Sequence, residues 1–213
     1  MQTSHLASPL TALLLAGGQG TRMGGADKGW VELDGIALAE RTAARLRPQA
    51  DALLISANRN LERYAALGQV VTDAPGYAGC GPLAGLEAGL AACPTEWLIT
   101  APCDLPLLPD NLAARLMAPL RLGEAQISVA HCAGQPQPVC MALSRALLPS
   151  LRAYLAGGGR RVREWQAANS ALAVAFDDAP LAFRNLNSPE DLARLEREWK
   201  DQASPPRAAP DQA

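Results

Sequence analysis

Short, continuously apolar runs alternate with amphipathic stretches along most of this chain. The run at 10–16 ends in glycines, as expected of a strand that is buried on both faces of a sheet. Short connections join the runs and stretches, which predicts a three-layer α/β domain with a mostly parallel sheet. The expected strands are residues 10–16, 52–56, 69–72, 97–101, 127–131, 139–143 and 172–176. The expected helices are residues 36–46, 83–92, 109–120, 144–155 and 189–199.

One strand of this sheet is expected to run against its neighbours. The runs at 127–131 and 139–143 are separated only by a short loop that contains Gly and Pro. A parallel connection needs a helical crossover of a dozen residues or so, which this loop cannot supply. The pair therefore predicts one antiparallel strand in a mixed sheet.

The length of the chain and its hydrophobic content predict one domain. With 213 residues, 49% of them hydrophobic, the chain can bury one sizeable core. Residues 1–8 and 203–213 are rich in small, polar and proline residues without apolar periodicity, so we expect disordered tails around a single domain at 9–202. The last helix is expected to begin inside that domain, because Ser188 suits the N-cap and Pro189 the first helical position.

Charge and cysteine content restrict the class of function. A net charge of -2 and a pI near 5.7 offer no general attraction to DNA or RNA, so no nucleic-acid partner is expected. No stretch approaches the roughly 18 apolar residues of a membrane helix, so no membrane association is expected. An odd set of cysteines without a CxxC pair is typical of reduced, mostly buried, non-catalytic thiols in the cytoplasm. These are Cys80, Cys93, Cys103, Cys132 and Cys140.

The segment at 13–29 is the most informative about function, because it directly follows the first expected strand. In an open α/β sheet, ligands bind beyond the carboxyl ends of the strands. Glycines there let backbone N–H groups approach phosphate oxygens closely, and cationic side chains balance the phosphate charge. The glycines are Gly17, Gly18 and Gly20, and the cations are Arg22 and Lys28.

This glycine stretch differs from two better-known phosphate loops. The pattern GxxxxGK[ST] has no match in the chain, and GxGxxG fails because Met23 stands at the third glycine position. A plain flexible turn would have to explain Arg22, Lys28 and the further glycines Gly24 and Gly25 in the same short stretch. The stretch therefore predicts a phosphate-binding loop of another type.

Polar residues follow three of the other expected strands. Asp104 stands just past the run at 97–101, where its carboxylate could meet a hard cation that bridges phosphates or could cap the next helix. Asn58 and Asp73 follow the second and third strands and would line the same sheet edge. From the residues alone, both could be turn residues or readers of a nucleobase or ribose, because Asn offers donor and acceptor and Asp accepts.

The glycine stretch, LAGGQGTRMGGADKG, resembles the signature of the molybdenum cofactor guanylyltransferases. These belong to the wider group of nucleotidyltransferases with an LAxGxGxRMG loop. The resemblance continues in order through most of the chain and is more specific than any one motif. Its further parts are ANR at 57–59, TD at 72–73, GPLAGLEAGL at 81–90, APCDLP at 101–106 and NLNSPEDL at 185–192.

The resemblance implies a Rossmann-like nucleotidyltransferase domain with a mixed, mostly parallel sheet. It also implies Mg²⁺-dependent transfer of GMP from GTP to molybdopterin-bound molybdenum cofactor, with release of pyrophosphate. GTP and molybdopterin would be the substrates, and a molybdoenzyme-delivery protein is a further expected partner. The second glycine of Ala16-Gly17-Gly18 favours guanine, because cytidylyl relatives typically read LAAG there.

Residue roles follow from the same resemblance. Lys28, Arg22 and Asp104 would be catalytic, and Asp104 would hold the metal together with an asparagine just before the last helix. Asn187 is the first choice for that asparagine and Asn185 the second, since both flank Leu186 in an extended segment. The nucleotide site would comprise Leu15, Ala16, Gly17, Gly18, Gly20, Lys28, Asn58, Asp73 and Asp104.

Three alternatives stay open at this point. The chain could be a cytidylyltransferase for the same cofactor, a nucleotidyltransferase for a sugar or alcohol phosphate, or a nucleotide sensor that lost turnover. Lys28 and Asp104 argue against a sensor, which would be expected to lose them first. The basic residues Arg160, Arg161 and Arg163 could hold the acceptor's phosphate or pterin, or form an exposed solvated cluster.

Overall fold

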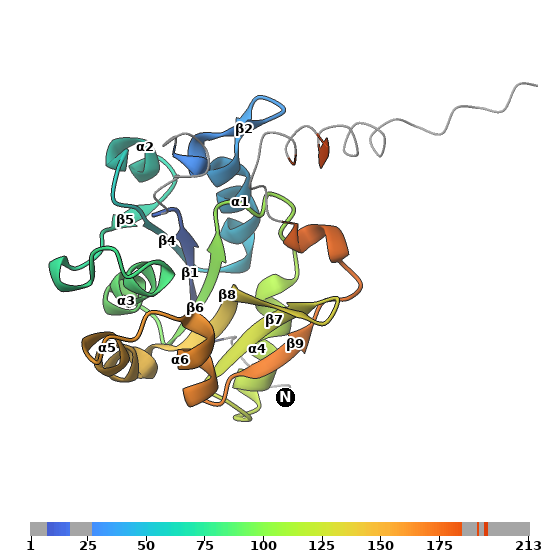
Figure 1. Cartoon of the computed structure of the whole chain (residues 1–213). Helices are drawn as coiled ribbons and strands as arrows, with labels where there is room; N and C mark the ends of the chain where they lie inside the picture. The colour runs from blue at the N-terminus through green and yellow to red at the C-terminus, as the bar shows by residue number, and fades with distance from the viewer. Residues whose placement is uncertain (1–7, 18–26, 185–190, 192–193, 196–213) are drawn as a thin grey trace, which may run out of the picture.

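A seven-stranded sheet forms the centre of the protein (Figure 1). The computed structural model describes residues 8–17, 27–184, 191 and 194–195. The strand order is β5-β4-β1-β6-β8-β7-β9. The strands of this sheet are β1 (Leu10–Leu15), β4 (Ala52–Ser56), β5 (Gln69–Val71), β6 (Trp97–Pro102), β7 (Ile127–Cys132), β8 (Gln135–Ser144) and β9 (Leu172–Ala175).

The sheet is mixed, as predicted. Strand β8 pairs antiparallel with both β6 and β7, whereas every other pair in the sheet is parallel. The two residues Ala133 and Gly134 between β7 and β8 both have positive φ, which is the backbone of a tight hairpin turn. The predicted strand at 139–143 is only the far part of β8, because the hairpin pairs residues from Gln135 onward.

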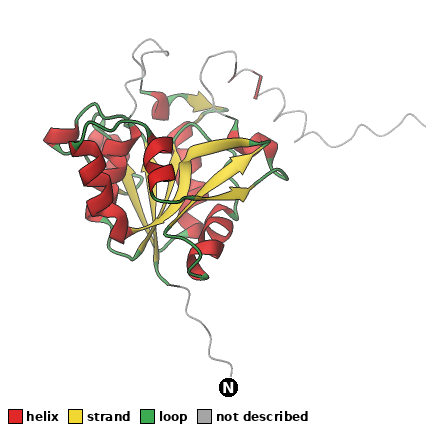
Figure 2. Ribbon diagram, turned by 60° about the horizontal axis from the view of Figure 1, so that its bottom comes forward, coloured by secondary structure: helices red, strands yellow, loops and turns green. Residues whose placement is uncertain are grey.

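Helices cover both faces of the sheet, which gives the three predicted layers (Figure 2). Strand β1 shows the division, because its side chains alternate between two cores. Ala12 and Leu14 join the core under α1 and α4, whereas Leu13 joins the core under α3 and α5. The helices are α1 (Leu38–Leu46), α2 (Leu61–Ala65), α3 (Pro82–Ala92), α4 (Leu112–Arg121), α5 (Leu148–Ala156) and α6 (Val162–Ala168).

Some element boundaries differ from the predicted ones. The helix expected at 36–46 begins at Leu38, because Asp34 and Gly35 turn the chain with positive φ and pair β2 (Glu32–Leu33) with β3 (Ile36–Ala37). The helices expected at 109–120 and 144–155 begin at Leu112 and Leu148, and a short 3-10 helix precedes the latter. Helices α2 and α6 were not predicted, because five and seven residues are too few for a clear helical period.

The C-terminal end is described only in part. Of the helix expected at 189–199, Asp191, Arg194 and Leu195 are helical, and Leu195 packs against Leu33 and Leu38. The predicted tails lie outside the described residues apart from Ser8, and the domain limits of 9 and 202 stay a prediction. Within the described part of the chain, no helix is long and apolar enough to cross a bilayer.

The order of the strands fixes where a ligand can bind. From β1 the chain moves to β4 and β5 on one side, then returns to β6 on the other side of β1. Such a switch in direction leaves a crevice at the carboxyl ends of the central strands. The residues that follow β1, β4, β5 and β6 therefore meet at one edge of the sheet.

Helix α3 lies close against these central strands because of its glycines. Pro82 begins the helix after Gly81, whose φ of 65° suits glycine. A Cβ at Gly85 would collide with the side chain of Ser56, and one at Gly89 with the side chain of Leu13. The small residues of the motif at 81–90 therefore allow close helix packing on the sheet.

Gly89→Val tests this packing. The added atoms meet the fully buried Leu13 and force the core apart, so we expect a loss of about 1–3 kcal/mol of unfolding free energy. Ala91→Val on the exposed side of the same helix is the matched control and costs only the lower helix propensity of valine, below about 0.7 kcal/mol. Urea unfolding measures both, and equal losses would contradict the close approach of α3.

Candidate functional site

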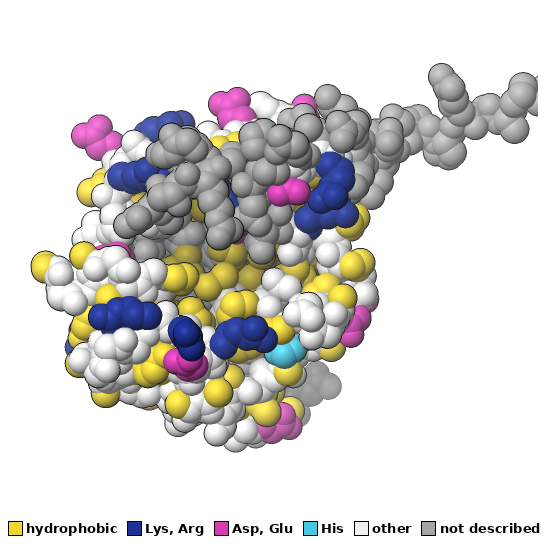
Figure 3. All heavy atoms as spheres, viewed as in Figure 1, with side chains coloured by type: hydrophobic (Ala, Val, Ile, Leu, Met, Phe, Trp, Pro, Cys, Tyr) yellow, Lys and Arg dark blue, Asp and Glu magenta, His cyan; other side chains and the backbone are white. Residues whose placement is uncertain are grey.

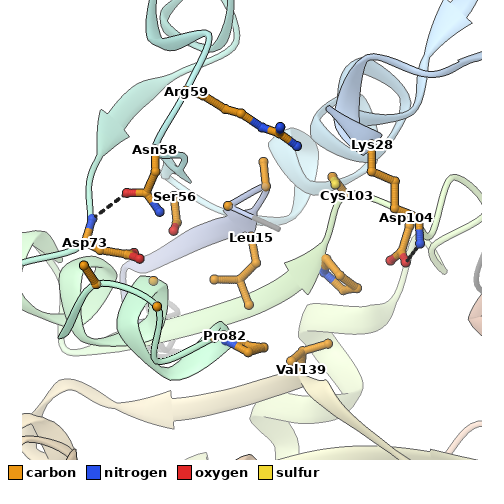
Figure 4. A pocket seen from close by; sticks show the side chains of 17 residues that line it. Leu15, Lys28, Ser56, Asn58, Arg59, Asp73, Pro82, Cys103, Asp104 and Val139 are labelled. Carbon is orange, nitrogen blue, oxygen red and sulfur yellow. Dashed lines mark hydrogen bonds and ion pairs between the residues drawn. The ribbon is translucent and has the colours of Figure 1, made fainter. Parts of the chain in front are cut away.

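A pocket of about 800 Å³ opens at the carboxyl ends of β1, β4, β5 and β6 (Figure 4). On this face of the molecule, hydrophobic side chains gather in a hollow and Lys and Arg side chains stand around it (Figure 3). The structure brings together every nucleotide-site residue predicted from the sequence that it describes. These pocket-lining residues are Leu15, Ala16, Gly17, Lys28, Asn58, Asp73 and Asp104.

Five predicted residues lie outside the described part of the chain. They are Gly18, Gly20, Arg22, Asn185 and Asn187. Their assignment to the phosphate loop and the metal site stays a prediction.

Lys28 and Asp104 form an ion pair at one end of the pocket. Lys28 Nζ donates to Asp104 Oδ2 at 2.6 Å, and the two side chains are 20% and 15% exposed. Asp104 follows β6, where Cys103 N donates to Leu15 O at 3.1 Å and keeps the chain beside β1. The buried hydroxyl of Thr42 lies near the carbonyls of Cys103 and Leu105, 3.3 and 3.4 Å away. The backbone just before Asp104 is therefore held beside β1.

The second carboxylate oxygen of Asp104 suits a hard cation. Asp104 Oδ1 is buried and accepts no hydrogen bond from the described residues. A buried carboxylate oxygen without a partner is costly, and a metal ion would satisfy it. The described residues contain no cluster of three His, Cys, Asp or Glu side chains. One carboxylate together with substrate phosphates is a usual binding mode for Mg²⁺, so the donor set fits this metal.

Asn58 and Asp73 form a polar pair at the other end of the pocket. Asp73 N donates to Asn58 Oδ1 at 3.0 Å, which links the segments after β4 and β5. Burial raises the pKa of the Asp73 carboxyl, and the nearby Glu87 raises this pKa further, while the hydrogen bond with Asn58 lowers it. The two residues offer one amide and one carboxyl for hydrogen bonds to a ligand.

Asp27 directly precedes the pocket residue Lys28, and its contacts were not predicted from the sequence. Its side chain is 6% exposed and accepts from Gly29 N at 3.2 Å, from Asn60 Nδ2 at 2.8 Å and from Tyr64 Oη at 2.8 Å. Burial raises the pKa of Tyr64, so its hydroxyl stays protonated and donates. The only signal in the sequence was a carboxylate directly before Lys28. Its side-chain partners Asn60 and Tyr64 follow more than thirty positions later, beyond the reach of any local pattern.

Cys103 lines the pocket without the properties of a nucleophile. It is buried, and burial together with Asp104 raises the pKa of its thiol to about 12. The thiol form therefore prevails at neutral pH. All five cysteines are free and buried, as predicted.

The basic residues after α5 are not part of the pocket lining. Arg161 pairs with Glu164 at 2.7 Å, and Arg160 donates to the carbonyl of Leu155 at 3.0 Å. Neither they nor Arg163 line the pocket, so their expected role toward an acceptor stays a prediction.

Comparisons with known proteins agree with this arrangement. Residues 12–172 match the model of the MobA-like NTP transferase domain. A molybdenum cofactor guanylyltransferase from Cupriavidus metallidurans is 45% identical over 196 residues, covering 89% of this chain and 95% of the relative. A molybdenum cofactor guanylyltransferase from Shewanella sp. strain MR-4 is 42% identical over 189 residues, covering 89% and 96%.

Solved structures share the fold. The crystal structure of molybdopterin-guanine dinucleotide biosynthesis protein A from Archaeoglobus fulgidus has a TM-score of 0.74 at 20% identity and covers 90% of this chain and 99% of that one. A 4-diphosphocytidyl-2C-methyl-D-erythritolsynthase from Anaerococcus prevotii has a TM-score of 0.72 at 12% identity, covering 91% and 96%. The mixed sheet, the pocket at its carboxyl edge, the matched domain and the close relatives together show that the chain belongs to the MobA-like NTP transferase family.

Proposed function

We propose that this protein transfers GMP from GTP to molybdopterin-bound molybdenum cofactor and releases pyrophosphate, forming molybdopterin guanine dinucleotide. Relatives that are 40–45% identical and match this chain over most of their length are named molybdenum cofactor guanylyltransferases, which supports this activity. The observation that carries it is one pocket with the polar pair Asn58 and Asp73 at one end and the ion pair Lys28 and Asp104 at the other.

The two ends of the pocket would bind different parts of a nucleoside triphosphate. Asn58 and Asp73 would read the guanine or ribose, since amide and carboxylate oxygens accept from guanine N–H groups and ribose hydroxyls. Lys28 would bind the phosphates, together with the backbone at Gly17. The space of about 800 Å³ is within the range of pockets that enclose a whole small molecule.

The transfer requires little covalent chemistry from the protein itself. The terminal phosphate of the acceptor attacks the α-phosphorus in line, the bond to the β-phosphate oxygen breaks, and pyrophosphate leaves with that electron pair. The attacking phosphate is already ionised at neutral pH, so no general base is needed. The chain's own contribution is to position the reactants and to stabilise negative charge.

Asp104 would hold Mg²⁺ through its buried Oδ1 atom. When bound, Mg²⁺ neutralises charge on the triphosphate and the leaving pyrophosphate. Lys28, 2.6 Å from Asp104, places a second positive charge at the same end of the pocket. We also place the reaction in the cytoplasm, which the five free, buried cysteines support.

Nucleotide choice is tested by competition binding. With Mg²⁺ present, we expect the protein to bind GTP at least about tenfold more tightly than CTP or UTP, because a wrong base leaves polar groups of the pocket unpaired. Displacement of labelled GTP by each unlabelled nucleotide gives the ratio. Equal or tighter binding of CTP would instead assign the chain to cytidylyl transfer.

Asp104→Ala tests turnover. We expect the variant to lose acceptor-dependent pyrophosphate release by about 100-fold or more, because charge on the phosphates is no longer neutralised. The control is Asp110→Ala, which removes an exposed carboxylate close by in sequence, paired with Arg45. Mass spectrometry of the wild-type reaction with molybdopterin identifies the guanine dinucleotide. Absence of pyrophosphate from the wild-type protein with every acceptor would point to a sensor.

A further inference from the structure

Arg59 is a second cation of the pocket. Among the described pocket-lining residues, the basic side chains are Lys28 and Arg59. Arg59 directly follows Asn58, and its side chain extends away from the Asn58 and Asp73 pair toward the side where Lys28 lies (Figure 4). The side chain is 36% exposed, so part of it stays open to solvent. Its charge therefore lies on the route between the two ends of the pocket.

The three side chains of the segment at 58–60 make different contacts. Asn58 is bonded to the backbone of Asp73, and Asn60 donates to Asp27. Arg59, between them, lines the pocket and has its Nε 3.7 Å from Asp27 Oδ2. Asn60 adopts a φ of 52°, so the chain turns sharply into α2 at this point. Hydrogen bonds on both sides of Arg59 thus fix the backbone that carries it.

Asp27 does not need Arg59 as a partner. Its two carboxylate oxygens already accept from Gly29 N, Asn60 Nδ2 and Tyr64 Oη at 2.8 to 3.2 Å. The contact with Arg59 is longer, at 3.7 Å. A carboxylate that is satisfied without the guanidinium acts on it mainly through charge, which orients the Nε edge of the guanidinium.

We propose that Arg59 is a further phosphate-binding residue of this pocket, which contacts the terminal phosphates of the bound nucleoside triphosphate, and that Asp27 positions it. The assignment rests on the proposed GTP-dependent function. A planar guanidinium matches two phosphate oxygens at once, which the point charge of Lys28 does not. If the nucleoside binds at Asn58 and Asp73, the phosphates lie toward Lys28. The side chain of Arg59 extends in that direction (Figure 4).

A ligand series separates this role from a structural one. We expect Arg59→Ala to weaken GTP binding roughly 10- to 100-fold, as for the loss of hydrogen bonds to a charged group, and to leave guanosine binding unchanged. Arg59→Lys keeps the charge and is expected to recover part of the loss. Equilibrium dialysis with labelled GTP and labelled guanosine, each with Mg²⁺, measures both ligands.

Arg63→Ala is the matched control. Arg63 lies four positions further on, stacks on Trp30 at 3.8 Å and does not line the pocket, so GTP binding is expected to stay at the wild-type value. Wild-type affinity of Arg59→Ala for GTP, or an equal loss for GTP and guanosine, would overturn the assignment alone. Wild-type protein that binds no GTP would overturn the proposed function and the assignment together.

Asp27→Asn tests the positioning step. The substitution can keep an oxygen for Gly29 and Tyr64 at the Oδ1 position, and it removes the charge and the Oδ2 acceptor that face Arg59 and Asn60. We expect weaker GTP binding with unchanged guanosine binding. In the Arg59→Ala background the same substitution is expected to have no further effect on GTP. An additive loss there would show that Asp27 does not act through Arg59.

Discussion

The parallel pairing of β1 with β4 and β6 determines the rest of the site. In this register Leu15 lies opposite Ser56 on one side and opposite Pro102 on the other. Backbone hydrogen bonds continue beyond the strand ends, from Ala16 N to Ser56 O at 2.8 Å and from Cys103 N to Leu15 O at 3.1 Å. The ends of β1, β4 and β6, which are far apart in the sequence, are thereby held side by side. The residues that follow these three strands therefore lie close to one another. Shifting one strand by one residue would turn its side chains to the opposite face.

Because the segments after these strands lie close together, the charged groups of the site are partly shielded from water. Removing a carboxylate from water is costly unless donors or cations replace the lost hydration. Asp27 meets this cost with three hydrogen-bond donors, and Oδ2 of Asp104 meets it with Lys28. Only Oδ1 of Asp104, among the described carboxylate oxygens, is buried without a hydrogen bond. This carboxylate oxygen without a partner thus stands where Mg²⁺ is proposed to bind.

The sequence predicted the framework of this site better than its contacts. The apolar run at 10–16 became Leu10–Leu15, because a strand buried on both faces has to be continuously apolar. The closeness of Asn58 and Asp73 also followed from strand order, since both come directly after neighbouring parallel strands. The network around Asp27 was missed, because Asn60 and Tyr64 reach it only through the packing of a five-residue helix. The turn at Asp34 overrode the apolar spacing that had placed Ile36 in a helix.

Strand β8 shows how the antiparallel element completes the pocket wall. The pairing of β7 and β8 shifts register after Val129, so residues 138–140 bulge out of the ladder. Two buried donors hold this bulge, because Thr100 donates to Val139 O and Gln166 to Pro138 O, each at 2.7 Å. Val139 consequently lines the pocket opposite the polar segments (Figure 4). Helix α6 has seven residues and little helical signal of its own. The hydrogen bond from its Gln166 to Pro138 O therefore helps to fix the helix against β8.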